Sequence, residues 1–242
     1  MKKRFKQLIT KYFLIAVILF MGALFLWKFG LPQLLRAYLQ FGIGTCGKIP
    51  ILCKMPQEDL GEVAVNKEFI AGLVEYRFPN TKILVPRQFN IVFERIRKYY
   101  YKKYKRMDKG ATIYLLHEPV DFFITLFPDI KKKGIEDDYE FLSRTMCANL
   151  GTVNNVTDAF FVIMKSIFVP NLSDQNHVKM IRLSFDGKRA FINYYLSEKG
   201  NFFDCSLVSL KEGFFKIYIK DPLAQLDLEK VIAIASTIHA LN

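Results

Sequence analysis

The chain has 242 residues, of which 51% are hydrophobic and 15% aromatic, and this composition excludes an intrinsically disordered protein. The net charge of +12 comes almost entirely from two segments, because residues 1–11 carry +5 and residues 94–109 carry +6. The rest of the chain is close to neutral, so we do not expect nucleic acid as a partner.

Residues 12–27 are apolar and uncharged, and with their flanks they are long enough to cross a hydrocarbon core of about 30 Å. The run ends in bulky residues up to Phe29 without a small-residue cleavage site, which favours a retained signal anchor over a cleaved signal peptide. A buried core helix is the alternative interpretation. Five Lys or Arg precede the run and few follow it, which predicts a single-pass protein with a cytoplasmic N-terminus and an extracytoplasmic C-terminal domain.

The chain therefore divides into four predicted parts. They are a cytoplasmic basic tail (1–11), a transmembrane signal anchor (12–29) in contact with the lipid bilayer, a juxtamembrane helix with a Cys/Pro/Gly linker (30–66), and one extracytoplasmic domain (67–242). Within the third part, residues 31–41 are amphipathic, with Pro32 placed for a helix start. We expect this helix to lie at the membrane surface or to pack on the domain.

The linker contains two of the four cysteines, Cys46 and Cys53, in a Pro- and Gly-rich loop that can curl back on itself. Outside the cytoplasm such a pair is expected to be oxidised, so we predict a Cys46–Cys53 disulfide that contributes about 2.5 kcal/mol. Zinc is the weaker alternative, because neither C-x-x-C pairs nor paired histidines accompany these cysteines. Cys147 and Cys205 fall at apolar positions typical of a core, and whether they are bridged stays open.

The middle of the chain mixes strand and helix patterns. Residues 68–78, 81–85 and 111–116 are predicted strands. From Phe89 to Met107 large apolar and aromatic residues recur at steps of four and three, which predicts an amphipathic helix. Two further helices are predicted, one after Asp137 and Asp138 to about residue 149, and one over residues 157–169. The second is almost wholly apolar, and we expect it to be buried.

The last third alternates apolar and polar residues over four segments, 178–185, 189–196, 202–208 and 214–220. Asp186-Gly187 joins the first two, which is a strong signal for a β-hairpin. An apolar helix follows Asp221-Pro222, with His239 in its last turn. We predict an α+β fold, with a four-stranded antiparallel meander and packed helices. From about residue 81 to 241 this order resembles the small α/β/α sandwich of extrinsic photosystem proteins and their bacterial relatives. The resemblance rests on topology and implies only a fold.

The segment 94–109 is the strongest candidate binding feature. Its bases interleave with four tyrosines, and no acid stands between the first base and Met107. The bases are Arg95, Arg97, Lys98, Lys102, Lys103, Lys105, Arg106 and Lys109. This composition suits anionic lipid headgroups or another polyanion, with the tyrosines at headgroup level. The alternative is a merely solvated helix face.

Signals for catalysis are weak. His117, His177 and His239 lie far apart, with no pair at the helical spacing of a zinc site. Glu136, Asp137 and Asp138 are read as capping residues at a helix start. We predict no catalytic residue, cofactor or metal. The leading prediction is a non-enzymatic membrane-anchored domain that binds a membrane-protein or envelope partner or supports an envelope assembly. An anionic-headgroup-binding module and an enzyme with dispersed catalytic residues are the alternatives.

Overall fold

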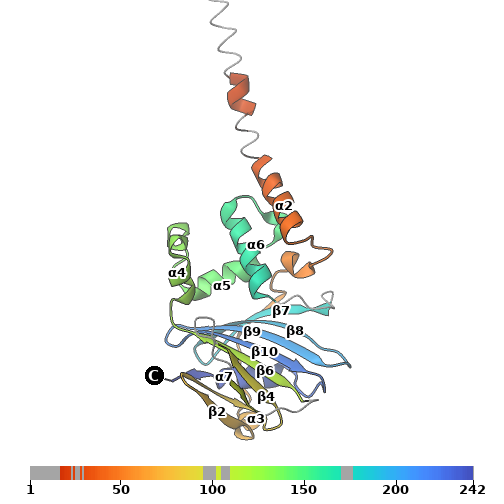
Figure 1. Cartoon of the computed structure of the whole chain (residues 1–242), viewed down its shortest axis with the longest axis vertical. Coiled ribbons are helices and arrows are strands. Elements are labelled where there is room, and N and C mark those ends of the chain that lie inside the picture. Colours follow the sequence, from red (N-terminus) through yellow and green to blue (C-terminus); the bar gives the residue numbers. More distant parts are fainter. Residues whose placement is uncertain are drawn as a thin grey trace, which may run out of the picture.

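The computed structural model describes residues 17–22, 24, 28, 30–94, 102–104, 110–169 and 177–241. An eight-stranded sheet of order β1-β7-β8-β9-β10-β6-β4-β5 forms the centre of the molecule (Figure 1). Its strands are β1 (Glu58–Glu62), β4 (Asn90–Glu94), β5 (Lys102–Tyr104), β6 (Thr112–Glu118), β7 (Lys179–Phe185), β8 (Lys188–Tyr195), β9 (Asn201–Ser209) and β10 (Gly213–Asp221). The sheet is mixed, since β1 pairs parallel with β7 and β4 parallel with β6.

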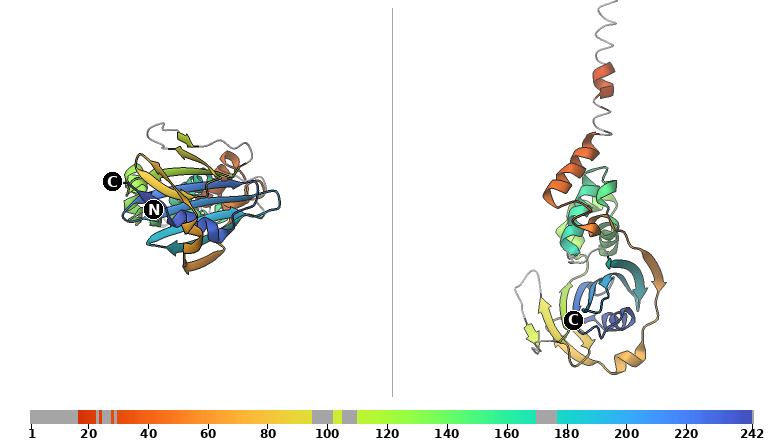
Figure 2. Two further views of the ribbon diagram at one scale, coloured as in Figure 1. Left: turned by 90° about the horizontal axis from the view of Figure 1, so that it is seen from below. Right: turned by 90° about the vertical axis from the view of Figure 1, so that its right-hand side faces the viewer.

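One side of this sheet is closed by a second sheet and a helix. The second sheet has the order β11-β3-β2. These elements are α3 (Lys67–Ala71), β2 (Val74–Phe78), β3 (Thr81–Val85), α7 (Leu228–Ser236) and β11 (His239–Ala240). The right-hand view of Figure 2 shows α7 enclosed between the strands of the two sheets. The core on this side is apolar throughout, with Phe185, Ile217 and Ile234 fully buried.

The other side carries the remaining helices (Figure 1). These are α2 (Leu31–Gly42), η2 (Pro50–Cys53), α4 (Phe122–Leu126), η3 (Pro128–Lys133), α5 (Asp138–Cys147), η4 (Leu150–Thr152) and α6 (Val156–Phe168). Aromatic rings hold α4 and α5 on the sheet, with Phe123 stacked on Phe141 at 4.5 Å and edge-on to Phe214 of β10 at 4.9 Å. Leu39 of α2 and Leu52 of η2 join a smaller cluster with Val162 of α6.

The predicted meander is present as β7–β10, with strand limits within about two residues of those expected. Its first turn has positive φ at both central residues, 46° at Asp186 and 71° at Gly187, as a two-residue hairpin with the right twist requires. Gly213 begins β10 with φ 91°, and a Cβ there would lie 2.3 Å from the carbonyl oxygen of Glu118. Only glycine fits this close approach of two chain segments.

The predicted fold class is nevertheless wrong. The meander is the centre of a large mixed sheet and is accompanied by a three-stranded sheet, so the fold is mixed α/β. Edge strand β1 escaped sequence analysis because all five of its residues are exposed and carry no apolar alternation.

The predicted transmembrane signal anchor is also wrong. Among the described residues, no helix is both long enough and apolar enough to cross a membrane. Much of the run 12–29 lies outside the described residues. The described part of the run includes a six-residue helical piece at 17–22.

Three local predictions need correction as well. Residues 68–78 are not one strand, because Asn66 caps α3 by accepting from the Phe69 N–H and β2 starts only at Val74. The predicted helix 89–107 is wrong at both places where the structure describes it, since β4 and β5 pair antiparallel there. His239 lies in β11, beyond the end of α7, and pairs with Lys82 of β3.

Candidate functional site

In α6 several large apolar side chains are exposed to solvent and the lysine is buried, which is the reverse of the usual distribution. Val156, Ile163 and Ile167 are 67%, 36% and 65% exposed, and they lie with the half-buried Phe160 on one stripe of the helix. Their spacing of four, three and four residues places all four on one face. We call these four residues the α6 apolar face. The sequence prediction that this helix is buried is therefore wrong for one face.

The only base of α6, Lys165, points the opposite way and has no exposed surface. Its ammonium donates to the carbonyl oxygen of Ala148 at 2.8 Å and to that of Lys54. Burial lowers the pKa of Lys165 to about 8. Because Ala148 follows α5 and Lys54 follows η2, this one side chain joins three helices of the layer.

A cavity opens at the start of the α6 apolar face. Its volume is about 410 Å³, and Val156 and Phe160 form one wall while Leu126, Phe127 and Lys133 form much of the other. The opposite wall is fixed by Asp138, whose buried carboxylate accepts from the backbone N–H groups of Phe122 and Phe123 at 2.9 and 2.8 Å. The sequence predicted that Asp138 caps the helix it begins. Instead Asp138 caps α4, and Asp137 caps α5.

A second cavity, also of about 410 Å³, lies at the other end of the α6 apolar face. Ile167 and Phe168 contribute from the helix, while Tyr114 of β6 and Tyr218 and Lys220 of β10 contribute from the sheet. Burial raises the pKa of Tyr218 to about 12, so its hydroxyl is a neutral hydrogen-bonding group at physiological pH.

A buried ion pair joins this second cavity to the helix. The ammonium of Lys216 lies 2.6 Å from Asp204 Oδ1 and also donates to Ser206 Oγ at 2.8 Å and to the carbonyl oxygen of Phe168 at 2.9 Å. Burial raises the pKa of the Asp204 carboxyl, and Lys216 opposes this effect. The pair therefore fixes the last turn of α6 to the sheet.

The predicted disulfide is confirmed, since Cys46 and Cys53 are bonded with their Cα atoms 5.7 Å apart. It closes the loop between α2 and η2 and thereby holds α2 beside α6. Cys147 and Cys205 are free thiols, and Cys205 is fully buried on the α7 side as expected.

The predicted anionic-surface site is only partly within the described residues. Lys102 and Lys103 belong to edge strand β5 of the large sheet. The other six bases, Arg95, Arg97, Lys98, Lys105, Arg106 and Lys109, lie outside the described residues. Binding of anionic headgroups by this segment stays a prediction. The prediction assumed a helix, whereas Lys102 and Lys103 lie in a strand.

Two of the three distant histidines converge on one residue, Glu212. His117 donates from Nε2 to the Glu212 carbonyl oxygen at 2.8 Å, and His239 Nδ1 lies 3.0 Å from Glu212 Oε1. The buried ammonium of Lys188 lies 3.7 Å from Glu212 Oε2 and donates to the carbonyl oxygen of Ser236 at the end of α7. Burial lowers the pKa of Lys188. No spacing in the sequence indicated this cluster.

His239 and two hydroxyl side chains line a polar cavity of about 300 Å³. Both hydroxyls bond to the backbone at the end of α7, since Ser236 donates to the Ala233 carbonyl and Thr237 to the Ile234 carbonyl. Thr237 also accepts from the Leu84 N–H of β3. The hydrogen bonds of both hydroxyls are therefore made with backbone groups. Within the described residues, no three or more His, Cys, Asp or Glu are grouped to hold a metal ion.

Comparison with known proteins adds no identification, because no family model, no curated protein and no solved structure matches the chain.

The α6 apolar face with its two end cavities is thus the best-defined candidate site. Its side chains offer apolar contact along three turns of helix, with depressions at both ends that can each accept a side chain. One feature of the sequence could have indicated this face. The apolar residues from Val156 to Ile167 recur at steps of four, three and four, and the only lysine of the helix falls on the opposite side.

Proposed function

We propose that this chain is a non-enzymatic binding protein, and that its partner is a protein that docks an amphipathic helix along the α6 apolar face. The single observation that supports this most is the reversed orientation of α6, with large apolar residues in solvent and a lysine in the core. Exposed apolar clusters of this kind in a folded protein mark interaction surfaces.

The dimensions of the site favour a helical partner. Val156 and Ile167 are eleven residues apart, which is about 16 Å along a helix, or three turns. A partner helix with apolar residues at steps of three and four would cover this length and place its end residues in the two cavities. The first cavity carries both Asp129 and Lys133, whereas the second carries the exposed Lys220. An acidic residue at the Ile167 end of the partner helix would therefore be complementary.

Photocrosslinking in the source cells tests the proposal. A benzophenone amino acid replaces Ile167 in one variant and Leu210 in the other, because both side chains are 65% exposed and Leu210 lies on the distant β9–β10 turn. We expect a specific protein adduct from position 167 only. The captured protein is then purified and titrated against the wild type and the Ile163→Asp/Ile167→Asp variant.

The proposal predicts that the double variant binds at least about tenfold more weakly, while Leu210→Asp binds like the wild type. Equal crosslinking from positions 167 and 210, or equal affinity of the double variant and the wild type, would contradict it.

A further inference from the structure

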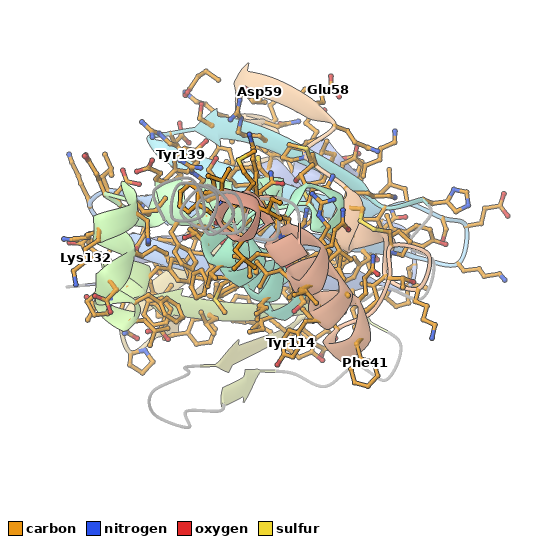
Figure 3. The ribbon with its side chains drawn as sticks, turned by 90° about the horizontal axis from the view of Figure 1, so that it is seen from above. Phe41, Glu58, Asp59, Tyr114, Lys132 and Tyr139 are labelled. Carbon is orange, nitrogen blue, oxygen red and sulfur yellow. A yellow bond between two sulfur atoms is a disulfide. The ribbon has the colours of Figure 1, made fainter. Side chains whose placement is uncertain are left out.

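A different surface carries a second inference. On α2, Leu35 and Leu39 face the helical layer, while Leu34, Tyr38 and Phe41 form the opposite edge. These three side chains are 70%, 73% and 94% exposed, and their spacing of four and three residues aligns them. We call them the α2 outer edge. Figure 3 shows Phe41 projecting outward at the end of the helix.

The α2 outer edge protrudes and is not part of a groove. A partner that covers it must therefore be deformable or must itself contain a groove. Earlier in the chain Ile18, Leu19 and Phe20 are also each more than 60% exposed. Leucine with tyrosine and phenylalanine on one helix edge is the composition of helices that lie in a lipid interface.

The charge of residues 1–57 indicates which kind of lipid surface would bind the α2 outer edge. The first acidic residue of the chain is Glu58, and the 57 residues before it contain nine Lys or Arg. Lys48 is exposed in the loop that follows α2. A segment with apolar residues on its surface and only positive charges is complementary to a lipid surface that carries negative headgroups.

We infer that the α2 outer edge docks on an anionic lipid surface, with Leu34, Tyr38 and Phe41 entering the headgroup region. The Cys46–Cys53 loop and the contact of α2 with α6 then fix how the folded domain faces that surface. The inference concerns a helix lying on the lipid, and it holds whether or not a protein partner binds the α6 apolar face.

Tryptophan fluorescence in the full-length chain tests the inference, because Trp27 is the only native tryptophan. One variant combines Trp27→Phe with Phe41→Trp, and its control combines Trp27→Phe with Leu210→Trp on the far turn. Each is mixed with vesicles of brominated phosphatidylcholine, with or without an equal part of phosphatidylglycerol. We expect a blue shift and strong quenching at position 41 with anionic vesicles, weaker quenching with zwitterionic ones, and none at position 210.

A charge reversal sharpens the result. Lys48→Glu in the Phe41→Trp background leaves the apolar edge intact and should reduce quenching by anionic vesicles severalfold. Absence of quenching at position 41, equal quenching at positions 41 and 210, or equal quenching by the two kinds of vesicle would overturn the inference.

Discussion

α7 and α6 lie on opposite sides of the large sheet, and both are rich in apolar residues. On the α7 side a curved sheet and a smaller sheet enclose the helix, so that Val231, Ile232 and Ile234 are all buried in an apolar core. On the α6 side only part of the helix is covered. The buried contacts there include two lysines. Lys216 joins the sheet to the end of α6, and Lys165 joins α6 to the end of α5.

Apolar composition alone does not determine how much of a helix is buried. An apolar helix is buried on every side only where other elements surround it, as the two sheets surround α7. α6 has the sheet beneath it and α2 and α5 beside it, and its remaining side is left to solvent. Buried charges such as Lys165 and Lys216 then define one orientation of the helix, which keeps the α6 apolar face directed outward.

The largest effect is expected from breaking the ion pair that holds the end of α6. Lys216→Met leaves the fully buried Asp204 without its counter-charge, and we expect a loss of about 3–5 kcal/mol in the free energy of unfolding. Urea denaturation measures the loss. Lys220→Met, four residues further along β10 and exposed, is the control and should stay within about 0.5 kcal/mol of the wild type. Adding Asp204→Leu to Lys216→Met should restore most of the stability, and a failure to do so would argue against the pair as the cause.

A pH effect of similar size is expected at Lys165. Its pKa falls from 10.5 in the unfolded chain to about 8 in the folded protein, so between these values the unfolded chain binds more protons. The wild type should therefore gain up to about 3 kcal/mol in unfolding free energy, relative to Lys165→Met, as pH rises from 8 to 10.5. Parallel urea titrations across this range measure the difference. Identical pH profiles for the two proteins would mean that Lys165 is not buried as a cation.

A smaller effect is expected at Asp138, which positions α4 beside the start of α6. Asp138→Ala removes the acceptor for the Phe122 and Phe123 N–H groups, and we expect a loss of about 2 kcal/mol. Asp137→Ala removes only the cap of α5 and should cost about 1 kcal/mol. The shift in urea midpoint compares the two. A larger shift for Asp137→Ala would contradict the assignment of the caps.

Strand alternation and turn chemistry made the C-terminal third predictable. Phe203, Cys205 and Leu207 are all buried on the α7 side, as their period of two requires, and Asp186-Gly187 forms the expected turn. The Cys46–Cys53 disulfide was predictable for a similar reason, because both partners are close in sequence. Local signals of this kind depend on neighbours along the chain.

The failures have the opposite cause. The step of four between Phe89 and Phe93 fits a helix and a strand equally well. The pairing of β4 with β6, about twenty residues away, decides for the strand. The partners of Lys165 come from positions 54 and 148, and those of Glu212 from positions 117, 188 and 239. No local sequence pattern predicts contacts over such separations. The candidate site could therefore not be predicted from the sequence.

If the α6 apolar face is a docking surface, it is exposed and is not needed for folding, whereas α7 is needed. The most direct test is urea unfolding of Ile167→Asp beside Ile234→Asp, since one isoleucine is 65% exposed and the other fully buried. We predict that Ile167→Asp stays within about 0.5 kcal/mol of the wild type and that Ile234→Asp loses more than about 4 kcal/mol or fails to fold. A loss of more than about 2 kcal/mol for Ile167→Asp would mean that the chain itself covers this face, which would contradict its role as a docking surface.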